Sequence, residues 1–301
     1  MTTRFGDATS IDVDRGVPFA TPDGATLRLD LYRPGRRRGT RPERGSTTAG
    51  VTARRAAVVV VPGRDWRAPD RGEWARYALD LAERGFVCAV PEYRGSGAVT
   101  FPAQVRDLKA AVRWLRARGE DVGVDPARIG ALGHDAGAHL AMLAALTPGD
   151  DGLAPRPSAF DESVRDDAAT ASDALAAVVG VSGTYALEHQ PETDALVSLL
   201  GGDREAAPEA WRRASPSTYL EADGDDGDSN GSRSHPPVLL LHGEDDDVVP
   251  PMGSELFYDL LEAHDAPADC VVAADAGHDV HETQRGFVLE WTAGFLDRQL
   301  R

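Results

Sequence analysis

The 301-residue sequence predicts an α/β protein built on one mostly parallel sheet with helices on both faces. Short apolar runs alternate with amphipathic helical stretches along the chain, the order that gives parallel strands joined by crossover helices. The valine-rich run at 56–62, AAVVVVP, is typical of a strand buried on both faces. No repeat divides the chain, so we expect one domain over residues 1–301.

The N-terminal segment 11–34 is predicted to form a β-hairpin, because alternating apolar positions flank Pro22-Asp23-Gly24. Residues 35–55 contain seven arginines and few apolar side chains. A solvated loop is the expectation there, and a local anion-binding patch is the competing hypothesis. A strand at 56–62 and a helix from about 71 to 84 come next.

The remaining elements follow from periodicity and from turn residues. We expect strands at 86–91, 129–132, 174–182, 237–242 and 268–274, and helices at 104–118, 252–264 and from about 282. Short helical patterns in 186–222 suit a small cap over the sheet. Two acidic segments have little to bury, and we expect an acidic, solvated insertion at 148–173 and a flexible loop at 223–235.

Composition narrows the class of function. The formal net charge is −17, and Lys109 is the only lysine. This balance resembles adaptation to high salt, or reflects a biased genome, and it disfavours binding to nucleic acid. Cys88 and Cys270 lie in apolar stretches and are expected to be free thiols. No apolar run is long enough to span a bilayer and the N-terminus has no secretory pattern, so we expect a cytoplasmic protein without a membrane role.

The most informative stretch is 128–146, RIGALGHDAGAHLAMLAAL. An apolar run meets Gly133-His134-Asp135-Ala136-Gly137, and a helical stretch follows at once. This is the strand–turn–helix setting of a nucleophile elbow, G-x-Nu-x-G, in which small neighbours let one side chain stand at the tip of a strained turn. Serine is the usual nucleophile, but here the central residue is Asp135.

Two later loops complete a candidate triad. HGEDDDVVP, residues 242–250, follows one predicted strand, and Gly277-His278 follows the last one. The carboxyl ends of parallel strands share one edge of the sheet, so both loops should open beside the elbow. Position in the loop leaves Asp245, Asp246 and Asp247 as candidates for the acid, and His278 is the candidate base.

Collinear motifs over nearly the whole chain resemble the esterase/lipase group of α/β-hydrolases, and most of all its kynurenine-formamidase-like and bacterial feruloyl-esterase-like (BD-FAE) branch. The matching stretches are 24–34, 92–94, FPAQVRDLKAAVRWL at 101–115, 125–140, VSGTY at 181–185, 242–250 and 277–278. The resemblance implies an α/β-hydrolase fold with a small cap, and a hydrolase of the esterase/formamidase lineage that acts on a small ester, amide or related bond at a site of Asp135, Asp246 and His278. The spacing HG-x-x-D-x-x-V-P selects Asp246 as the acid.

The oxyanion loop departs from the pattern of that branch. Where the branch reads H-G-G-x-W, this chain reads Pro62-Gly63-Arg64-Asp65-Trp66. Glycines in this loop let backbone N–H groups converge on a developing oxyanion. We expect Ala136, Arg64 and Gly63 to form the oxyanion hole, with the N–H of Arg64 paired with that of Ala136.

Asp135 is the larger departure and leaves three hypotheses open. A carboxylate is a poor nucleophile for an ester, but it suits an sp³ carbon such as that of an epoxide or alkyl halide, and related hydrolases carry G-H-D-x-G. Epoxide opening would also need acidic hydroxyls, for which Tyr185 and Tyr219 are the candidates. The second hypothesis is a weak water-activating Asp–His pair, and the third is an inactive, ligand-binding pseudohydrolase.

The remaining candidate residues are weaker. Trp66, Tyr185 and His134 are candidate pocket residues, and Ser182 is a less favoured nucleophile. His134 and His139 have no metal-ligand pattern around them in the sequence, so we expect no metal and no organic cofactor. A small-molecule substrate is the expected partner, and the sequence does not indicate an oligomeric state.

Overall fold

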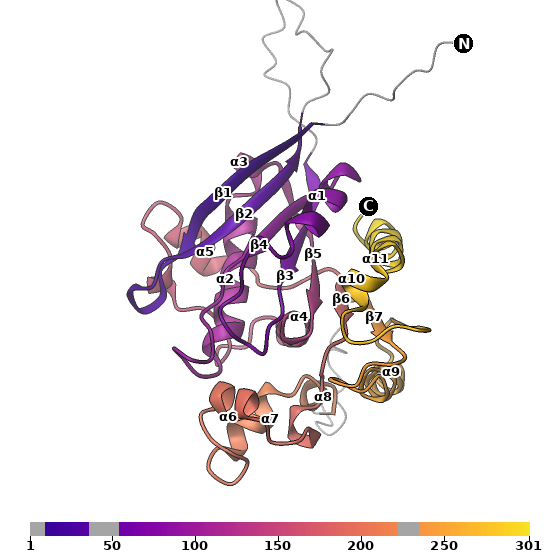
Figure 1. Ribbon diagram of the computed structural model, residues 1–301. Coiled ribbons are helices and arrows are strands. Elements are labelled where there is room, and N and C mark those ends of the chain that lie inside the picture. The colour runs from indigo at the N-terminus through magenta and orange to yellow at the C-terminus, as the bar shows by residue number, and fades with distance from the viewer. Residues whose placement is uncertain (1–9, 36–53, 222–234) are drawn as a thin grey trace, which may run out of the picture.

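The structure is a computed structural model that describes residues 10–35, 54–221 and 235–301. Its eight-stranded sheet has the order β1-β2-β4-β3-β5-β6-β7-β8 (Figure 1). β1 pairs with β2 and β2 with β4 in the antiparallel sense, and every other pair is parallel. The predicted mostly parallel α/β fold is confirmed.

The strands are β1 (Ile11–Ala20), β2 (Leu27–Pro34), β3 (Arg55–Val61), β4 (Val87–Pro91), β5 (Val124–His134), β6 (Val178–Val181), β7 (Val238–Gly243) and β8 (Ala268–Ala273). The α-helices are α1 (Ala75–Glu83), α2 (Ala103–Ala117), α3 (Gly119–Val122), α4 (Ala136–Leu146), α5 (Arg165–Thr170), α6 (Asp194–Leu200), α7 (Pro208–Ala214), α8 (Ser217–Glu221), α9 (Met252–Ala263), α10 (Val280–Thr283) and α11 (Arg285–Leu300). Short 3-10 helices are η1 (Pro22–Gly24), η2 (Pro157–Ala159) and η3 (Leu187–His189).

The sheet separates two hydrophobic cores. In β3, Ala57, Val59 and Val61 face the core that α2, α4 and α9 cover. Val58 and Val60 face the opposite core, which α1 and α11 cover. Because successive side chains of a strand point to opposite faces, a strand between two helical layers must be apolar at every position, which explains the valine run.

Several boundaries differ from the prediction. The first helix begins at Ala75 rather than near residue 71, because residues 71–74 form turns in which the N–H of Gly72 bonds the carboxylate of Asp70 at 2.8 Å. β5 is longer than predicted, and its register against β3 shifts between Arg55 and Ala57.

The segment 148–173, expected in solvent, packs against the body of the molecule. Leu153, Phe160, Val164 and Ala168 are buried in the core. Residues 186–221 form η3, α6, α7 and α8, which lie beyond the carboxyl ends of the parallel strands (Figure 1). We place the small cap there. The arginine-rich loop expected at 35–55 and the flexible loop expected at 223–235 lie mostly outside the described residues.

The structure places the single lysine and the two cysteines of the sequence. Lys109 is wholly buried in α2, where its ammonium donates to the carbonyl of Thr147, and burial lowers its pKa to about 8. Cys88 is buried and Cys270 is half-buried, and both are free thiols, as predicted. Within the described ranges, no helix is long and apolar enough to cross a membrane.

Candidate active site

Asp135 stands alone between the last residue of β5 and the first residue of α4. Its backbone has φ 49° and ψ −122°, a conformation that residues other than glycine rarely adopt. A Cβ on Gly133 would lie 2.3 Å from the carbonyl oxygen of Gly137, and a Cβ on Gly137 would lie 2.1 Å from that of Val61. These contacts give the predicted elbow and the reason for its two glycines.

The oxyanion loop reaches the elbow from β3. The backbone N–H of Asp65 donates to Oδ2 of Asp135 at 3.1 Å, and the N–H of Ala136 also bonds this carboxylate. Ala136 therefore lies where the sequence predicts it. The second donor is Asp65 and not Arg64, whose side chain pairs with Glu73 at 2.5 Å on the surface.

Gly63 has a different task from the one predicted. A Cβ on Gly63 would lie 1.9 Å from the carbonyl oxygen of His134, so the residue permits the loop to pass close to the elbow and donates nothing to Asp135. Asp65 adopts φ 49° and Trp66 φ 56°, and this local turn directs the N–H of Asp65 inward.

The carboxylate of Asp135 is therefore held by donors that an oxyanion would use. Burial raises the pKa of Asp135, and this outweighs the two N–H donors and the positive charge of His278, all of which lower it. Asp135 is half-buried at the tip of the turn, and a carboxylate that has lost part of its hydration is a stronger nucleophile than one in water.

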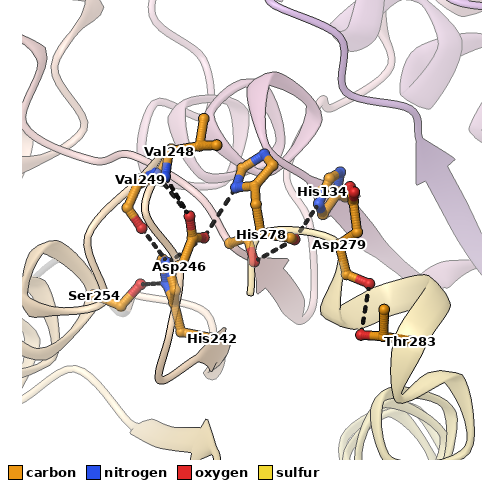
Figure 2. Close-up of polar contacts among 10 residues, drawn as sticks. His134, His242, Asp246, Val248, Val249, Ser254, His278, Asp279 and Thr283 are labelled. Atoms are coloured by element: carbon orange, nitrogen blue, oxygen red, sulfur yellow. Dashed lines mark hydrogen bonds and ion pairs between the residues drawn. The ribbon is translucent and has the colours of Figure 1, made fainter. Parts of the chain in front are cut away.

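His278 and Asp246 form a hydrogen-bonded pair at the same edge of the sheet. Nδ1 of His278 lies 2.9 Å from Oδ2 of Asp246, as Figure 2 shows. Asp246 is 5% exposed, whereas Asp245 and Asp247 face solvent. The spacing argument for Asp246 thus agrees with the geometry.

A dense set of donors surrounds Asp246. The N–H groups of Val248 and Val249 donate to Oδ1 at 3.0 and 2.8 Å (Figure 2). Nε2 of His242 lies 3.0 Å from Oδ2 and 2.8 Å from the carbonyl oxygen of Val249. Both neighbours are acceptors, so we assign the proton of His242 to Nε2, and its Nδ1 accepts from the hydroxyl of Ser254 at 2.7 Å.

The hydrogen bond and the opposite charges of this pair lower the pKa of Asp246 and raise the pKa of His278. Burial alone would raise the pKa of Asp246, but the bonds from His242, His278 and the N–H of Val249 hold it well below its usual range. Burial alone would lower the pKa of His278, but the hydrogen bond and charge of Asp246, helped by the charge of Asp135, raise it. His278 is thus a stronger base than a free imidazole.

The charges of His278 and Asp135 act on each other's pKa. Among the described residues, no hydrogen bond joins them: the carboxylate of Asp135 is bonded by backbone N–H groups, and the Nδ1 bond of His278 goes to Asp246. Nε2 of His278 is the nitrogen left for a water molecule or substrate.

Trp66, Tyr185 and Ser182 do not take the roles that the sequence predicts for them. Trp66 is buried and its Nε1–H donates to Nδ1 of His139 at 2.9 Å, so it supports the loop. Tyr185 is 2% exposed and stacks on Phe257 in the core, so it lies outside any open pocket surface. Ser182 is buried and donates to the carbonyl oxygen of His278 at 3.1 Å, a supporting role and not that of a nucleophile.

His134 lies next to His278 in a cluster of ring contacts. Its Nε2 lies 3.2 Å from the carbonyl oxygen of His278 (Figure 2). The rings of His134 and His278 are 5.0 Å apart, those of His134 and His281 3.9 Å, and those of His281 and Trp74 5.1 Å. Sequence reasoning missed His281 and Trp74, and the three-residue spacing from His278 to His281 was the one available signal.

The fold and the elbow together define an α/β-hydrolase. The chain belongs to the BD-FAE family, whose family model matches residues 48–261. Two relatives from Mycobacterium tuberculosis are similar to it: the esterase LipQ, 31% identical over 88% of this chain and 56% of its own length, and the probable carboxylic ester hydrolase LipM, 31% identical over 70% and 46%. The chain spans about half the length of these relatives.

A solved structure supports the fold. A truncated carbohydrate esterase from gut microbiota has a TM-score of 0.74 at 23% identity, covering 98% of both chains. The relatives are ester hydrolases, so the family is one of hydrolases of esterase type.

Proposed function

We propose that this chain is a hydrolase of the esterase lineage in which Asp135 is the covalent nucleophile and attacks an sp³ carbon. The observation that carries the proposal is that the carboxylate of Asp135 already accepts from the backbone N–H groups of Asp65, at Oδ2, and of Ala136. A serine esterase needs these donors for the oxyanion of its substrate. In this chain the same donors suit an oxyanion that forms on Asp135 itself.

The chemistry proceeds in two steps. Oδ1 of Asp135 displaces a leaving anion from the substrate carbon and forms an alkyl ester with the enzyme. A water molecule that loses its proton to Nε2 of His278 then attacks Cγ of Asp135. The oxyanion formed on Oδ2 is held by the N–H groups of Asp65 and Ala136. Its collapse releases the alkoxide, which takes the proton from His278, and leaves Asp135 as a carboxylic acid, which loses its remaining proton to solvent and so becomes a carboxylate again.

Asp246 keeps His278 in the tautomer with a free Nε2 and stabilises its cationic form. Neither phenol proposed for epoxide opening is offered to a substrate: the hydroxyl of Tyr185 is buried and has no partner among the described residues, and that of Tyr219 is already bonded. Tyr185 is in the core, and Tyr219 donates to the carbonyl oxygen of Arg213 at 3.0 Å. A substrate with a stable leaving anion, such as an alkyl halide, therefore fits better than an epoxide.

The test is a single turnover of a short primary bromoalkane with enzyme in excess in ¹⁸O-water. We expect ¹⁸O in the side chain of Asp135, located by mass spectrometry of its peptide. A His278→Gln variant should accumulate the alkyl ester, and Asp135→Asn should form none. Turnover without label at residue 135 would refute the covalent mechanism, and no turnover of any alkyl substrate would favour a ligand-binding pseudohydrolase.

The esterase lineage supports a second experiment. In Asp135→Ser the carboxylate no longer occupies the donors of Asp65 and Ala136, so the substrate oxyanion can enter. We expect this variant to hydrolyse p-nitrophenyl acetate faster than the wild type, with Asp135→Ala as the matched control. A folded Asp135→Ser protein without a gain would show that the loop around Arg64 and Asp65 cannot serve an ester.

A further inference from the structure

We propose that His134, His281 and Asp279 form a binding site for a divalent transition-metal ion of the zinc type, directly behind the catalytic imidazole. One ligand atom from each of the three residues lies within 4.8 Å of the other two. The residues come from the end of β5, from α10 and from the turn before α10. This runs against the expectation of no metal site from the sequence.

The set of donors suits such an ion. Two imidazoles and one carboxylate are ligands that Zn²⁺ accepts, and an ion held at about 2.0–2.2 Å from each would place them about 3.4 Å apart. The contraction needed is at most about 1.4 Å, and the exposed side chain of Asp279 can supply most of it. Two imidazoles make Mg²⁺ and Ca²⁺ poor candidates, because both prefer oxygen ligands.

One of the three residues carries an unsatisfied atom. Nδ1 of His281 is buried and has no hydrogen-bond partner among the described residues. A buried polar nitrogen without a partner is destabilising, and a metal ion would satisfy it. Asp279 accepts the hydroxyl of Thr283 at 3.0 Å through its backbone oxygen (Figure 2), and within the described ranges no hydrogen bond engages its carboxylate.

The surrounding rings hold the imidazoles in place. Trp74 stacks on His281 with an angle of 9° between the planes, and His134 contacts both rings, with centroids 3.9 Å from His281 and 5.8 Å from Trp74. His134 is 5% exposed and immediately precedes Asp135. The site is therefore preorganised by packing, apart from the carboxylate. Metal binding here does not depend on Asp135 acting as the nucleophile.

The test measures metal binding and not hydrolysis. Metal-free protein is titrated with Zn²⁺ in competition with a chromophoric chelator. We expect one tight equivalent in the wild type, and its loss in His281→Phe, which keeps a ring against Trp74. The control is His189→Phe, because the side chain of His189 is 77% exposed elsewhere on the molecule. An unchanged affinity in His281→Phe, or no tight equivalent in the wild type, overturns the proposal.

Two further measurements keep the proposal falsifiable if His281→Phe does not fold. Asp279→Asn alters an exposed side chain, and we expect its affinity for Zn²⁺ to fall at least about tenfold. In wild-type protein, stoichiometric Zn²⁺ should shift the imidazole NMR signals of His134 and His281 together. Shifts confined to His278 and His242 would place the ion on the triad instead and refute this site.

Discussion

Replacing Asp246 with asparagine is the sharpest perturbation of the proposed triad. The change keeps the shape of the side chain and its Oδ1, which accepts from the N–H groups of Val248 and Val249. It replaces Oδ2, which faces Nδ1 of His278 and Nε2 of His242 at 2.9 and 3.0 Å, with an NH₂ group. The NH₂ group of the asparagine and the N–H groups of the two imidazoles, all hydrogen-bond donors, then face one another in a buried site.

The expected cost has two parts. A buried donor left without an acceptor lowers the free energy of unfolding by about 1–3 kcal/mol. His278 can avoid the clash by moving its proton to Nε2, but the ring then loses the nitrogen that takes a proton from water. The loss of the correct tautomer reduces kcat on the order of 10⁴-fold in serine–histidine–aspartate triads, and we expect a loss of similar order here.

The stability difference between wild type and Asp246→Asn should depend on pH. The pKa of Asp246 is depressed, so its contribution is present above the ordinary value of 3.8 and disappears as the pH falls through the depressed pKa. The pKa of His278 is raised, so its contribution is complete below the ordinary 6.5 and disappears as the pH rises through the raised pKa. The difference should therefore be largest between about pH 4 and 6.5.

Urea unfolding across this pH range measures the difference, with Asp247→Asn as the matched control. That variant makes the same change one residue away on an exposed side chain, and we expect it to stay within about 0.5 kcal/mol of the wild type. NMR titration should also show a lower pKa for His278 in Asp246→Asn. If both variants lose the same stability, or the pKa of His278 does not move, Asp246 is not the partner that the geometry indicates.

Three other predictions follow from the site. Gly137→Ala should cost at least about 1–3 kcal/mol of unfolding free energy in thermal melts, because its Cβ would meet the carbonyl oxygen of Val61 at 2.1 Å; a neutral result would contradict the close packing of the elbow. Trp66→Phe should cost about 1–3 kcal/mol, because Nδ1 of buried His139 loses its donor, and an unchanged urea midpoint would argue against that bond. Turnover should rise with pH through the raised pKa of His278 and then level off, since the imidazole must be neutral to accept a proton; a pH–rate profile that falls over this range would exclude it as the base.

The parts of the site that the sequence could predict are those with local patterns. The glycines of the elbow follow from the contacts of a tight turn, and the spacing in 242–250 was enough to select Asp246 over two neighbouring aspartates. The mostly parallel sheet follows from buried strands alternating with helices, and the valine run of β3 faces two cores as predicted.

The parts it could not predict depend on backbone angles or on distant contacts. Asp65 and not Arg64 donates to Asp135 because two successive residues adopt positive φ, which no glycine pattern signals. Tyr185 has a sequence position near the sheet edge, yet it stacks in the core on Phe257, a residue of α9. The contact of His134 with His281 joins β5 to α10 and requires the fold itself.

The burial of Lys109 makes this protein unusual towards reagents for primary amines. Apart from the terminal amine, the folded chain presents no amino group for acylation, because its single lysine lies in α2 without solvent exposure. Covalent labelling of that side chain would therefore occur at the rate at which α2 leaves the core. The rate at which the acylated Lys109 peptide appears would therefore measure the rate of global opening of the molecule.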